Sequence, residues 1–223
     1  AGVRTGDLNA PWPEEIFRVA IDGVAHWMFC PTDHCQRNVQ EEEGDAWITG
    51  QTGVDDLLQD VQPFHGKSDD RVLLTLHRRE TLVQLPEVMQ ALDWVAGRRA
   101  TQFVWPVHPN PLVQAAAKHL TYIQTIPPLG ARAFRRLLST SRLVVTDSGG
   151  VQEEAAVLGV PCLVARHQTD RPEPVLAGLQ RVVGVSPAGW PIRRNGSWIP
   201  RCCPAPHLAV MGTAPPGNGL CTY

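Results

Sequence analysis

The sequence predicts an α/β protein built on a doubly wound parallel sheet of Rossmann-like form. From residue 71 onward, short apolar runs alternate with segments of helical period, the order that produces a parallel sheet. The runs are apolar at nearly every position, which is typical of strands buried on both faces. Histidine, aspartate and arginine residues follow several of these runs, at the sheet edge where such folds bind their ligands.

Composition and charge exclude several classes of protein. The chain has 223 residues, of which 43% are hydrophobic and 19% charged, and its formal net charge is −2. A near-neutral chain without a recurring aromatic and basic patch predicts no nucleic-acid partner. No apolar run reaches about 18 residues, so we expect no membrane span, and no signal peptide is recognisable. We expect a cytoplasmic protein of one large domain or two small ones.

The cysteines offer one weak metal pattern. Cys30 and Cys35 stand on either side of His34, a spacing loosely typical of a metal site. No second pair of ligands completes a tetrahedral set. We therefore expect reduced, structural thiols and no metal.

The first part of the chain carries its own elements. A segment of helical spacing covers residues 14–29, with Glu14 and Glu15 in the first turn, where the helix dipole favours acids. A short strand is expected over 46–50 and a short helix over 54–61. These elements predict a small unit that precedes the alternating series.

The second part alternates regularly between strands and helices. Gly97 is placed to end one of the helices, and the run 161–166 is expected to close the series as its last strand. The expected strands are 71–77, 101–108, 122–126, 142–147 and 161–166, and the expected helices are 85–97, 111–120, 131–141 and 151–159.

Shifts in composition predict the domain boundaries. We interpret residues 1–61 as part of an N-terminal Rossmann-like domain, 62–70 as a linker and 71–185 as a C-terminal Rossmann-like domain. The tail 186–223 is rich in Pro, Arg, Trp and Cys and has no period. Arginines outnumber lysines eighteen to two, which suggests a GC-rich gene, so we hypothesise that 186–207 is translated out of frame.

The stretch TDSGGVQEE follows an apolar run and suits a phosphorylated ligand. Gly149 and Gly150 let the backbone approach a ligand closely, and the free N–H groups at a helix start favour an anion. Ser148 adds a hydroxyl donor, so a diphosphate fits. Glu153 or Glu154 can accept hydrogen bonds from both hydroxyls of a ribose. The alternative is an ordinary helix N-terminus with acids in its first turn.

Three further residues follow strand ends. His77, in HRRE, can bind a phosphate when protonated or act as an acid or base near neutral pH. Arg171, in TDRPE, can hold a phosphate or a sugar through its planar fork of donors. His108 lies between a strand and a rigid turn with two prolines and is mainly architectural, with a side chain that faces the ligand as the alternative. The alternatives are a histidine satisfied by local backbone and a surface Arg–Asp pair.

Taken together and in this order, the motifs resemble the non-hydrolysing UDP-N-acetylglucosamine 2-epimerases. The resemblance implies a glycosyltransferase-B-like pair of Rossmann-like domains with the UDP-sugar between them. It also implies interconversion of UDP-GlcNAc and UDP-ManNAc by elimination and re-addition of UDP, without a nicotinamide cofactor, in a homodimer. The matching stretches within residues 1–184 are AGVRTGDLNAPWPEE, ITGQTGVDDLL, LLTLHRRET, VWPVHPNP, LVVTDSGGVQEEAAVLGVPCLVAR and TDRPEP.

The resemblance also implies roles for single residues. Glu14 matches a catalytic carboxylate of the family, and His77 matches a histidine that contacts the phosphates. The residues that match the family's UDP site are Ser148, Gly149 and Gly150 for the diphosphate, Glu154 for the ribose, Arg171 for the sugar-phosphate and Phe134 for the edge of the uracil.

Some of the family's pattern is missing. A His-Val-Glu that carries a catalytic glutamate precedes the family's Ala-Gly, but this chain opens on Ala1. Gln51 replaces the family's Asn, and Asp170 stands where the family has Glu. We therefore keep a second hypothesis, a UDP-binding fragment without catalysis. HRRE and TDRPE disfavour an unrelated glycosyltransferase of the same architecture.

Overall fold

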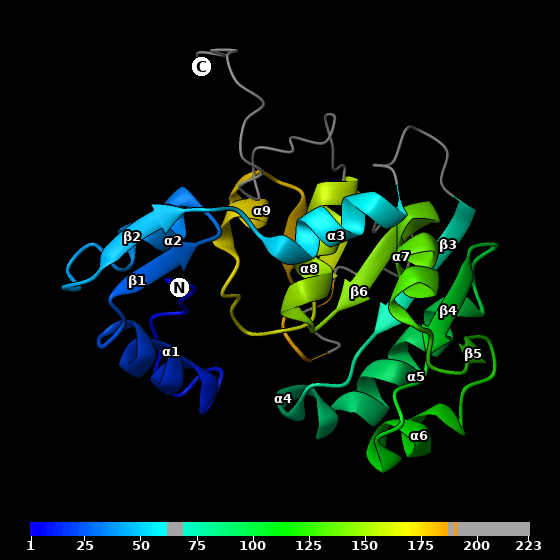
Figure 1. Cartoon of the computed structure of the whole chain (residues 1–223). Helices are drawn as coiled ribbons and strands as arrows, with labels where there is room; N and C mark the ends of the chain where they lie inside the picture. Colours follow the sequence, from blue (N-terminus) through cyan, green and yellow to red (C-terminus); the bar gives the residue numbers. More distant parts are fainter. Residues whose placement is uncertain (62–68, 187–189, 191–223) are drawn as a thin grey trace.

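The computed structural model describes residues 1–61, 69–186 and 190, and its main feature is a six-stranded parallel sheet (Figure 1). The strand order is β5-β4-β3-β6-β7-β8, so the chain builds outward from β3 in one direction and then returns to add β6 on its other side. The predicted fold class is confirmed. The strands are β3 (Asp69–Thr75), β4 (Gln102–Pro106), β5 (Gln124–Ile126), β6 (Ser141–Thr146), β7 (Cys162–Val164) and β8 (Gln180–Val182).

Helices cover both faces of this sheet and create two apolar cores. Alternate residues of β3 point to opposite faces. Leu74 therefore joins the cluster under α5 and α6, while Leu73 joins the cluster under α3, α7 and α8. The helices are α3 (Thr52–Asp60), α5 (Leu85–Ala96), α6 (Pro111–Ala117), α7 (Ala131–Thr140) and α8 (Gly149–Leu158), with short α4 (Arg79–Leu82) and α9 (Pro172–Leu176).

Residues 1–48, called here the N-terminal lobe, form a separate small layer with a two-stranded parallel sheet (Figure 1). Its own apolar cluster contains Met28, Cys30, Cys35 and Val39 and shares no member with the two clusters of the larger sheet. The elements of the lobe are α1 (Glu14–Asp22), β1 (Trp27–Cys30), α2 (Asp33–Arg37) and β2 (Asp45–Ile48).

The long helix expected over 14–29 is wrong in its second half. Helix α1 ends at Asp22, and residues Trp27 to Cys30 form β1. The side chains of β1 alternate between exposed and buried, with Met28 and Cys30 inside. That period of two is a strand pattern, and the preceding helical spacing concealed it because the two apolar runs adjoin.

The series of strands also continues further than expected. After β7 the chain forms α9 and then β8, which pairs with β7 in parallel. Strand β8 has only three residues, and Arg181 lies between its buried Gln180 and half-buried Val182. Such a short and polar strand has no recognisable apolar run.

Helix α3 packs on the larger sheet rather than on the lobe. Its Val54 and Leu57 are fully buried in the cluster that contains Leu138 of α7 and Ala155 of α8. We therefore propose that the boundary between the two units lies near residue 50 rather than 61. Most of the expected linker, residues 62–68, lies outside the described residues, as does nearly all of the expected irregular tail; Asp69 and Asp70 already belong to β3.

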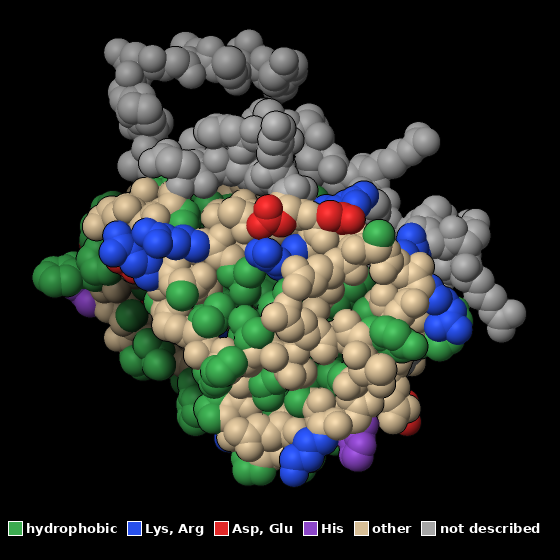
Figure 2. Space-filling model, turned by 90° about the vertical axis from the view of Figure 1, so that its right-hand side faces the viewer, with side chains coloured by type: hydrophobic (Ala, Val, Ile, Leu, Met, Phe, Trp, Pro, Cys, Tyr) green, Lys and Arg blue, Asp and Glu red, His purple; other side chains and the backbone are tan. Residues whose placement is uncertain are grey.

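Large apolar side chains are exposed mainly on the lobe. Val24 is 87% exposed and Trp27 65%, whereas such residues are scattered over the rest of the described chain. Figure 2 shows that on the face of the molecule to the right in Figure 1 apolar side chains are interspersed with polar and charged ones. None of the described helices could cross a membrane. The exposed apolar side chains of the lobe are Leu8, Trp12, Ile16, Phe17, Val19, Ile21, Val24, Trp27, Phe29, Trp47 and Ile48.

Limited proteolysis tests this division. We expect trypsin to cut the lobe first, after Arg18 or Arg37, because its small apolar cluster provides little free energy against local opening. The surviving fragment should begin after Arg37 and retain α3, as identified by mass spectrometry. A surviving fragment without α3, or equal protection of the whole chain, would contradict the proposed boundary.

Candidate functional site

The candidate site lies where the strand order reverses. Strands β3 and β6 are neighbours, but the connections after them lead to opposite sides of the sheet. The loops after such strands diverge and leave a crevice at their carboxyl ends, where open α/β sheets bind ligands. His77 follows β3 and Ser148 follows β6, so the structure brings two of the predicted residues to this point.

Asp147 joins the loops after β3 and β6. Its side chain is completely buried, and one carboxylate oxygen accepts hydrogen bonds from the backbone N–H groups of His77 and Arg78, both at 2.8 Å. These two N–H donors satisfy one oxygen of the buried carboxylate, while the other oxygen accepts no hydrogen bond from the described residues and lies 3.8 Å from Nδ1 of His77. The turn that carries His77 is therefore fixed beside Ser148. The residue's place directly before Ser-Gly-Gly was the only sequence signal for this role.

The ring of His77 stacks on that of His108, which lies two residues after the end of β4. Their ring centroids are 5.0 Å apart and the planes differ by 9°. Nδ1 of His108 accepts a hydrogen bond from the backbone N–H of Asn110 at 3.2 Å, which fixes that ring. Burial lowers the pKa of His77, and His108 and Arg78 lower it further, while Asp147 opposes them. The surroundings of His77 thus favour the neutral imidazole, and a negative charge placed nearby would raise the pKa again.

Ser148 to Gly150 form the start of α8. Ser148 is the N-cap in an extended conformation, but its hydroxyl makes no capping hydrogen bond. The first N–H groups of a helix have no partner within the helix. Gly149 is buried, and a Cβ atom added there would lie 3.4 Å from Cζ of Arg171. The guanidinium of Arg171 therefore lies next to the helix start, at the distance of an ordinary van der Waals contact from a side chain at position 149.

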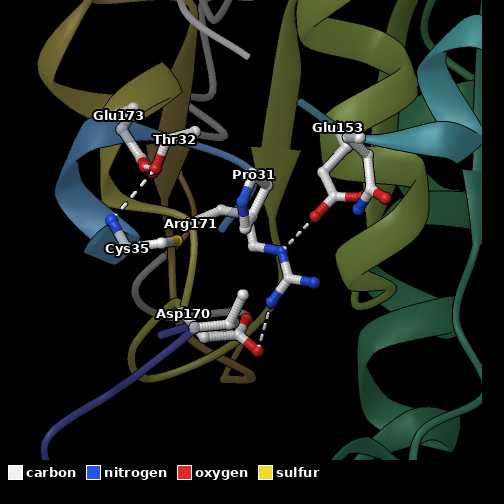
Figure 3. A pocket seen from close by; sticks show the side chains of 9 residues that line it. Pro31, Thr32, Cys35, Glu153, Asp170, Arg171 and Glu173 are labelled. Atoms are coloured by element: carbon white, nitrogen blue, oxygen red, sulfur yellow. Dashed lines mark hydrogen bonds and ion pairs between the residues drawn. The ribbon is translucent and has the colours of Figure 1, made fainter. Parts of the chain in front are cut away.

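Arg171 is held on two sides by carboxylates (Figure 3). Its Nε donates to Glu153 at 2.6 Å and its Nη1 lies 2.5 Å from Asp170. Glu153 also accepts a hydrogen bond from Gln51 at 3.0 Å. Both oxygens of Glu153 are thus occupied. The pKa of Arg171 is raised despite its burial, because Asp170 and Glu153 stabilise its charge.

Glu154 differs from Glu153 in its surroundings. It is half-buried and pairs with Nε of Arg135 at 3.3 Å. Arg135 also pairs with Asp56 at 2.7 Å and Asp60 at 2.8 Å, which ties α3 to α7 and α8. Burial raises the pKa of Glu154, and Arg135 lowers it in part. Of the two glutamates, only Glu154 has an oxygen without a hydrogen-bond partner among the described residues.

For the remaining predicted residues, Phe134 and Glu14, the described structure shows no contact with His77, Ser148 or Arg171. Phe134, on α7 and next to Arg135, is half-buried against the apolar cluster. Glu14 is exposed at the start of α1 and pairs with no side chain of the described residues. Its neighbour Glu15 is buried and accepts hydrogen bonds from the backbone of Thr5 and Gly6, at 2.8 and 3.1 Å. Glu15 is therefore structural.

The described cysteines are thiols. Cys30, Cys35 and Cys162 are free and buried, and burial raises the pKa of each. Within residues 1–61, 69–186 and 190, no group of three His, Cys, Asp or Glu side chains could hold a metal ion.

A family model described as UDP-N-acetylglucosamine 2-epimerase matches residues 1–189. The chain belongs to this family. The UDP-N-acetylglucosamine 2-epimerase of Salmonella typhimurium is 36% identical over an alignment covering 82% of this chain and 56% of that protein. For the Bacillus subtilis protein of the same name the identity is 38%, and the shares are 82% and 53%. The chain thus spans about half the length of these epimerases.

Solved epimerase structures have the same fold. The UDP-GlcNAc 2-epimerase of Neisseria meningitidis, solved with UDP-GlcNAc bound, is 31% identical with a TM-score of 0.75, over 85% of this chain and 57% of that one. That of Methanocaldococcus jannaschii, solved with UDP-GlcNAc and UDP, is 29% identical with a TM-score of 0.75, over 95% and 65%. The resemblance read from the motifs is confirmed.

Removing Arg135 should destabilise the fold more than removing its exposed neighbour. Arg135→Ala leaves the half-buried Glu154 without its cation and leaves Asp60 with only the exposed Arg132, and we expect a loss of about 2 kcal/mol in the free energy of unfolding. Arg132→Ala is the matched control, since Arg132 also pairs with Asp60 but its side chain is 69% exposed; its loss should stay below about 0.5 kcal/mol. Urea unfolding measures both. Equal losses of unfolding free energy in the two variants would show that the ion pairs of Arg135 contribute no more than those of an exposed arginine.

The pKa of His77 predicts a pH dependence. Because it is lowered in the folded state from its ordinary 6.5, the unfolded state binds the proton more readily. Stability present above pH 6.5 is then lost as the pH falls through the folded pKa. Between pH 8 and 5, His77→Gln should lose less unfolding free energy than the parent chain, and His119→Gln, at an exposed position, should match the parent. If the unfolding free energy of His77→Gln changes with pH as much as that of the parent chain, the prediction for His77 is contradicted.

Proposed function

We propose that this chain binds the UDP part of a UDP-sugar in the crevice between β3 and β6. The whole protein, on this proposal, interconverts UDP-GlcNAc and UDP-ManNAc by eliminating UDP and adding it back. The observation that carries the proposal is the meeting of a helix start, a guanidinium and a histidine at one point. Gly149 and Arg171 are in near contact there, and Asp147 fixes His77 beside them.

These three groups suit a departing diphosphate. Negative charge grows on the diphosphate as the bond to the sugar breaks, so donors already in place stabilise the transition state. The free N–H groups of α8 supply such donors, and Arg171 supplies a fixed cation. His77 adds a second positive charge if it takes a proton as the diphosphate binds.

The rest of the nucleotide extends along α8 and α7. Glu154 lies one turn into α8 from Gly150 and accepts the ribose hydroxyls. Phe134 lies on α7 next to Arg135, the partner of Glu154, and borders the uracil. Glu14, an exposed carboxylate, acts on the sugar as acid or base. The resemblance also supports a cytoplasmic homodimer for the whole protein.

A second candidate function is UDP binding without turnover. It is supported by the share of each reported relative's length that this chain covers, 53 to 65%. Within the described chain, Glu14 also makes no contact with another predicted site residue. Proton NMR of UDP-GlcNAc incubated with the chain distinguishes the two. We expect the signals of the bound sugar nucleotide without new UDP-ManNAc signals. Formation of UDP-ManNAc by the 223-residue chain would contradict the second candidate.

The ribose assignment predicts a preference between two nucleotides. The parent chain should bind UDP at least about tenfold more tightly than 2′-deoxy-UDP, because a site built around a hydroxyl rejects a ligand that lacks it. Glu154→Gln should reduce this ratio to about threefold or less, and Glu87→Gln, an exposed change on α5, should leave it unaltered. Isothermal titration calorimetry gives both dissociation constants. An unaltered ratio in Glu154→Gln would remove Glu154 from the ribose site.

A further inference from the structure

Asp170 has three arginines and no exposure to solvent. Its side chain is 0% exposed, and its two oxygens lie 3.0 Å from Nη1 of Arg166, 2.9 Å from Nη2 of Arg18 and 2.5 Å from Nη1 of Arg171. We call these four residues the arginine cluster. A single buried carboxylate needs only one cation to offset its charge. Three cations around it indicate that the carboxylate organises the arginines rather than the reverse.

The charges around the arginine cluster are consistent with a carboxylate that organises the three arginines. Burial raises the pKa of Asp170, but Arg171, Arg166 and Arg18 together lower it to about 2. Asp170 is thus ionised throughout the range in which proteins work. Two further carboxylates complete the balance, since Glu153 pairs with Arg171 at 2.6 Å and Glu15 with Arg18 at 3.4 Å.

The three arginines come from different parts of the fold. Arg166 follows β7, and Arg171 is the residue before α9. Arg18 belongs to α1 of the N-terminal lobe, four residues after Glu14, and so lies on the same face of that helix. Asp170 therefore connects the helix that carries Glu14 with the arginine that touches the helix start at Gly149.

This connection matters because the lobe shares no apolar cluster with the larger sheet. Hydrogen bonds also join the two units, among them one from Thr32 to Glu173 at 2.5 Å; Figure 3 shows these two side chains next to each other. Another joins Gln168 to the carbonyl of Ala10 at 3.4 Å. Of the contacts between the lobe and the described part of the sheet, only Arg18–Asp170 is an ion pair, and it ends on a fully buried oxygen.

We propose that Asp170 is a positioning residue of the diphosphate site, which holds Arg171 against Gly149 and, through Arg18, holds helix α1 against the same edge of the sheet. The proposal rests on the proposed function, because it takes the diphosphate as the ligand of Arg171. Asp170 does not touch the ligand. Its negative charge by itself disfavours an anion nearby, so its contribution to binding comes from geometry.

The charge of Asp170 and its positioning of Arg171 predict opposite changes in UDP affinity when the carboxylate is removed. Asp170→Asn makes the site more positive by one charge, so a purely Coulombic effect would strengthen UDP binding. Without its carboxylate the three guanidiniums repel one another, and Arg171 should leave its place. We expect UDP to bind the 223-residue Asp170→Asn chain at least about tenfold more weakly, since small misplacements of a binding group cost that much.

Two variants serve as matched controls in the same calorimetric titration. Asp170→Glu keeps the charge on a longer side chain and should bind UDP within about threefold of the parent. Asp93→Asn weakens a different structural carboxylate, which accepts hydrogen bonds from the backbone of Thr121, Tyr122 and Ile123. It should lower stability without changing UDP affinity. Unfolding curves for every variant separate loss of fold from loss of affinity.

Hydrogen exchange tests the part of the proposal that concerns the lobe. Arg18→Gln removes the ion pair to Asp170 but leaves Arg171 in place. The amides of α1, residues 14–22, should then exchange at least about tenfold faster while UDP affinity stays within about twofold. Unchanged exchange in α1 would overturn the tether through Arg18.

The outcomes separate this proposal from the proposed function. If the parent chain fails to bind UDP, the proposed function and this assignment both fall. If the parent binds and Asp170→Asn binds equally well or more tightly, the positioning role alone is overturned. Weaker binding by Asp170→Asn together with near-parent binding by Asp170→Glu supports it.

Discussion

The ion pair between Arg18 and the buried carboxylate of Asp170 joins the N-terminal lobe to the larger sheet. Apolar contacts tolerate sliding, but ion pairs and hydrogen bonds set direction and distance. Because the two units share no apolar cluster in the described chain, the placement of α1 is set by polar contacts that converge near Arg171. On the proposal made above, a change at Arg171 alters the position of the helix that carries Glu14. Catalysis by elimination would need that link, since the base acts on the sugar while the phosphate leaves.

Two pairs of adjacent glutamates show how the fold divides labour. In each pair one carboxylate is consumed by structure, Glu15 by the backbone of residues 5 and 6 and Glu153 by Arg171 and Gln51. The other carboxylate, Glu14 or Glu154, keeps access to a ligand. Adjacent residues on a helix point about 100° apart, so burial of one leaves the other at the surface. Each pair thus provides one carboxylate that holds the structure and one that is accessible to a ligand.

The sequence was informative where its signals are local. Continuous apolar runs marked five of the strands in the larger sheet, and the strand ends located His77 and Ser148 at one edge. It failed where two elements of different period adjoin, as at α1 and β1, and where a strand is as short and polar as β8.

The partners of the site residues were out of reach of local patterns. Asp147, Arg135 and Asp170 each act through residues that are distant in the chain, for example 70 positions from Asp147 to His77. Only the fold reveals such pairs, since the residue types alone fit a surface acid or base equally well. The same limit explains why the sequence placed α3 with the lobe, although its buried face packs on α7 and α8.

A crystal structure of the chain with UDP would show whether a diphosphate binds at the start of α8 against Arg171. We expect phosphate oxygens within hydrogen-bonding distance of the N–H groups of Gly149 and Gly150 and of the guanidinium of Arg171, with Arg171 still in contact with Asp170. UDP bound at another edge of the sheet, or a phosphate at α8 with Arg171 turned away, would contradict this expectation.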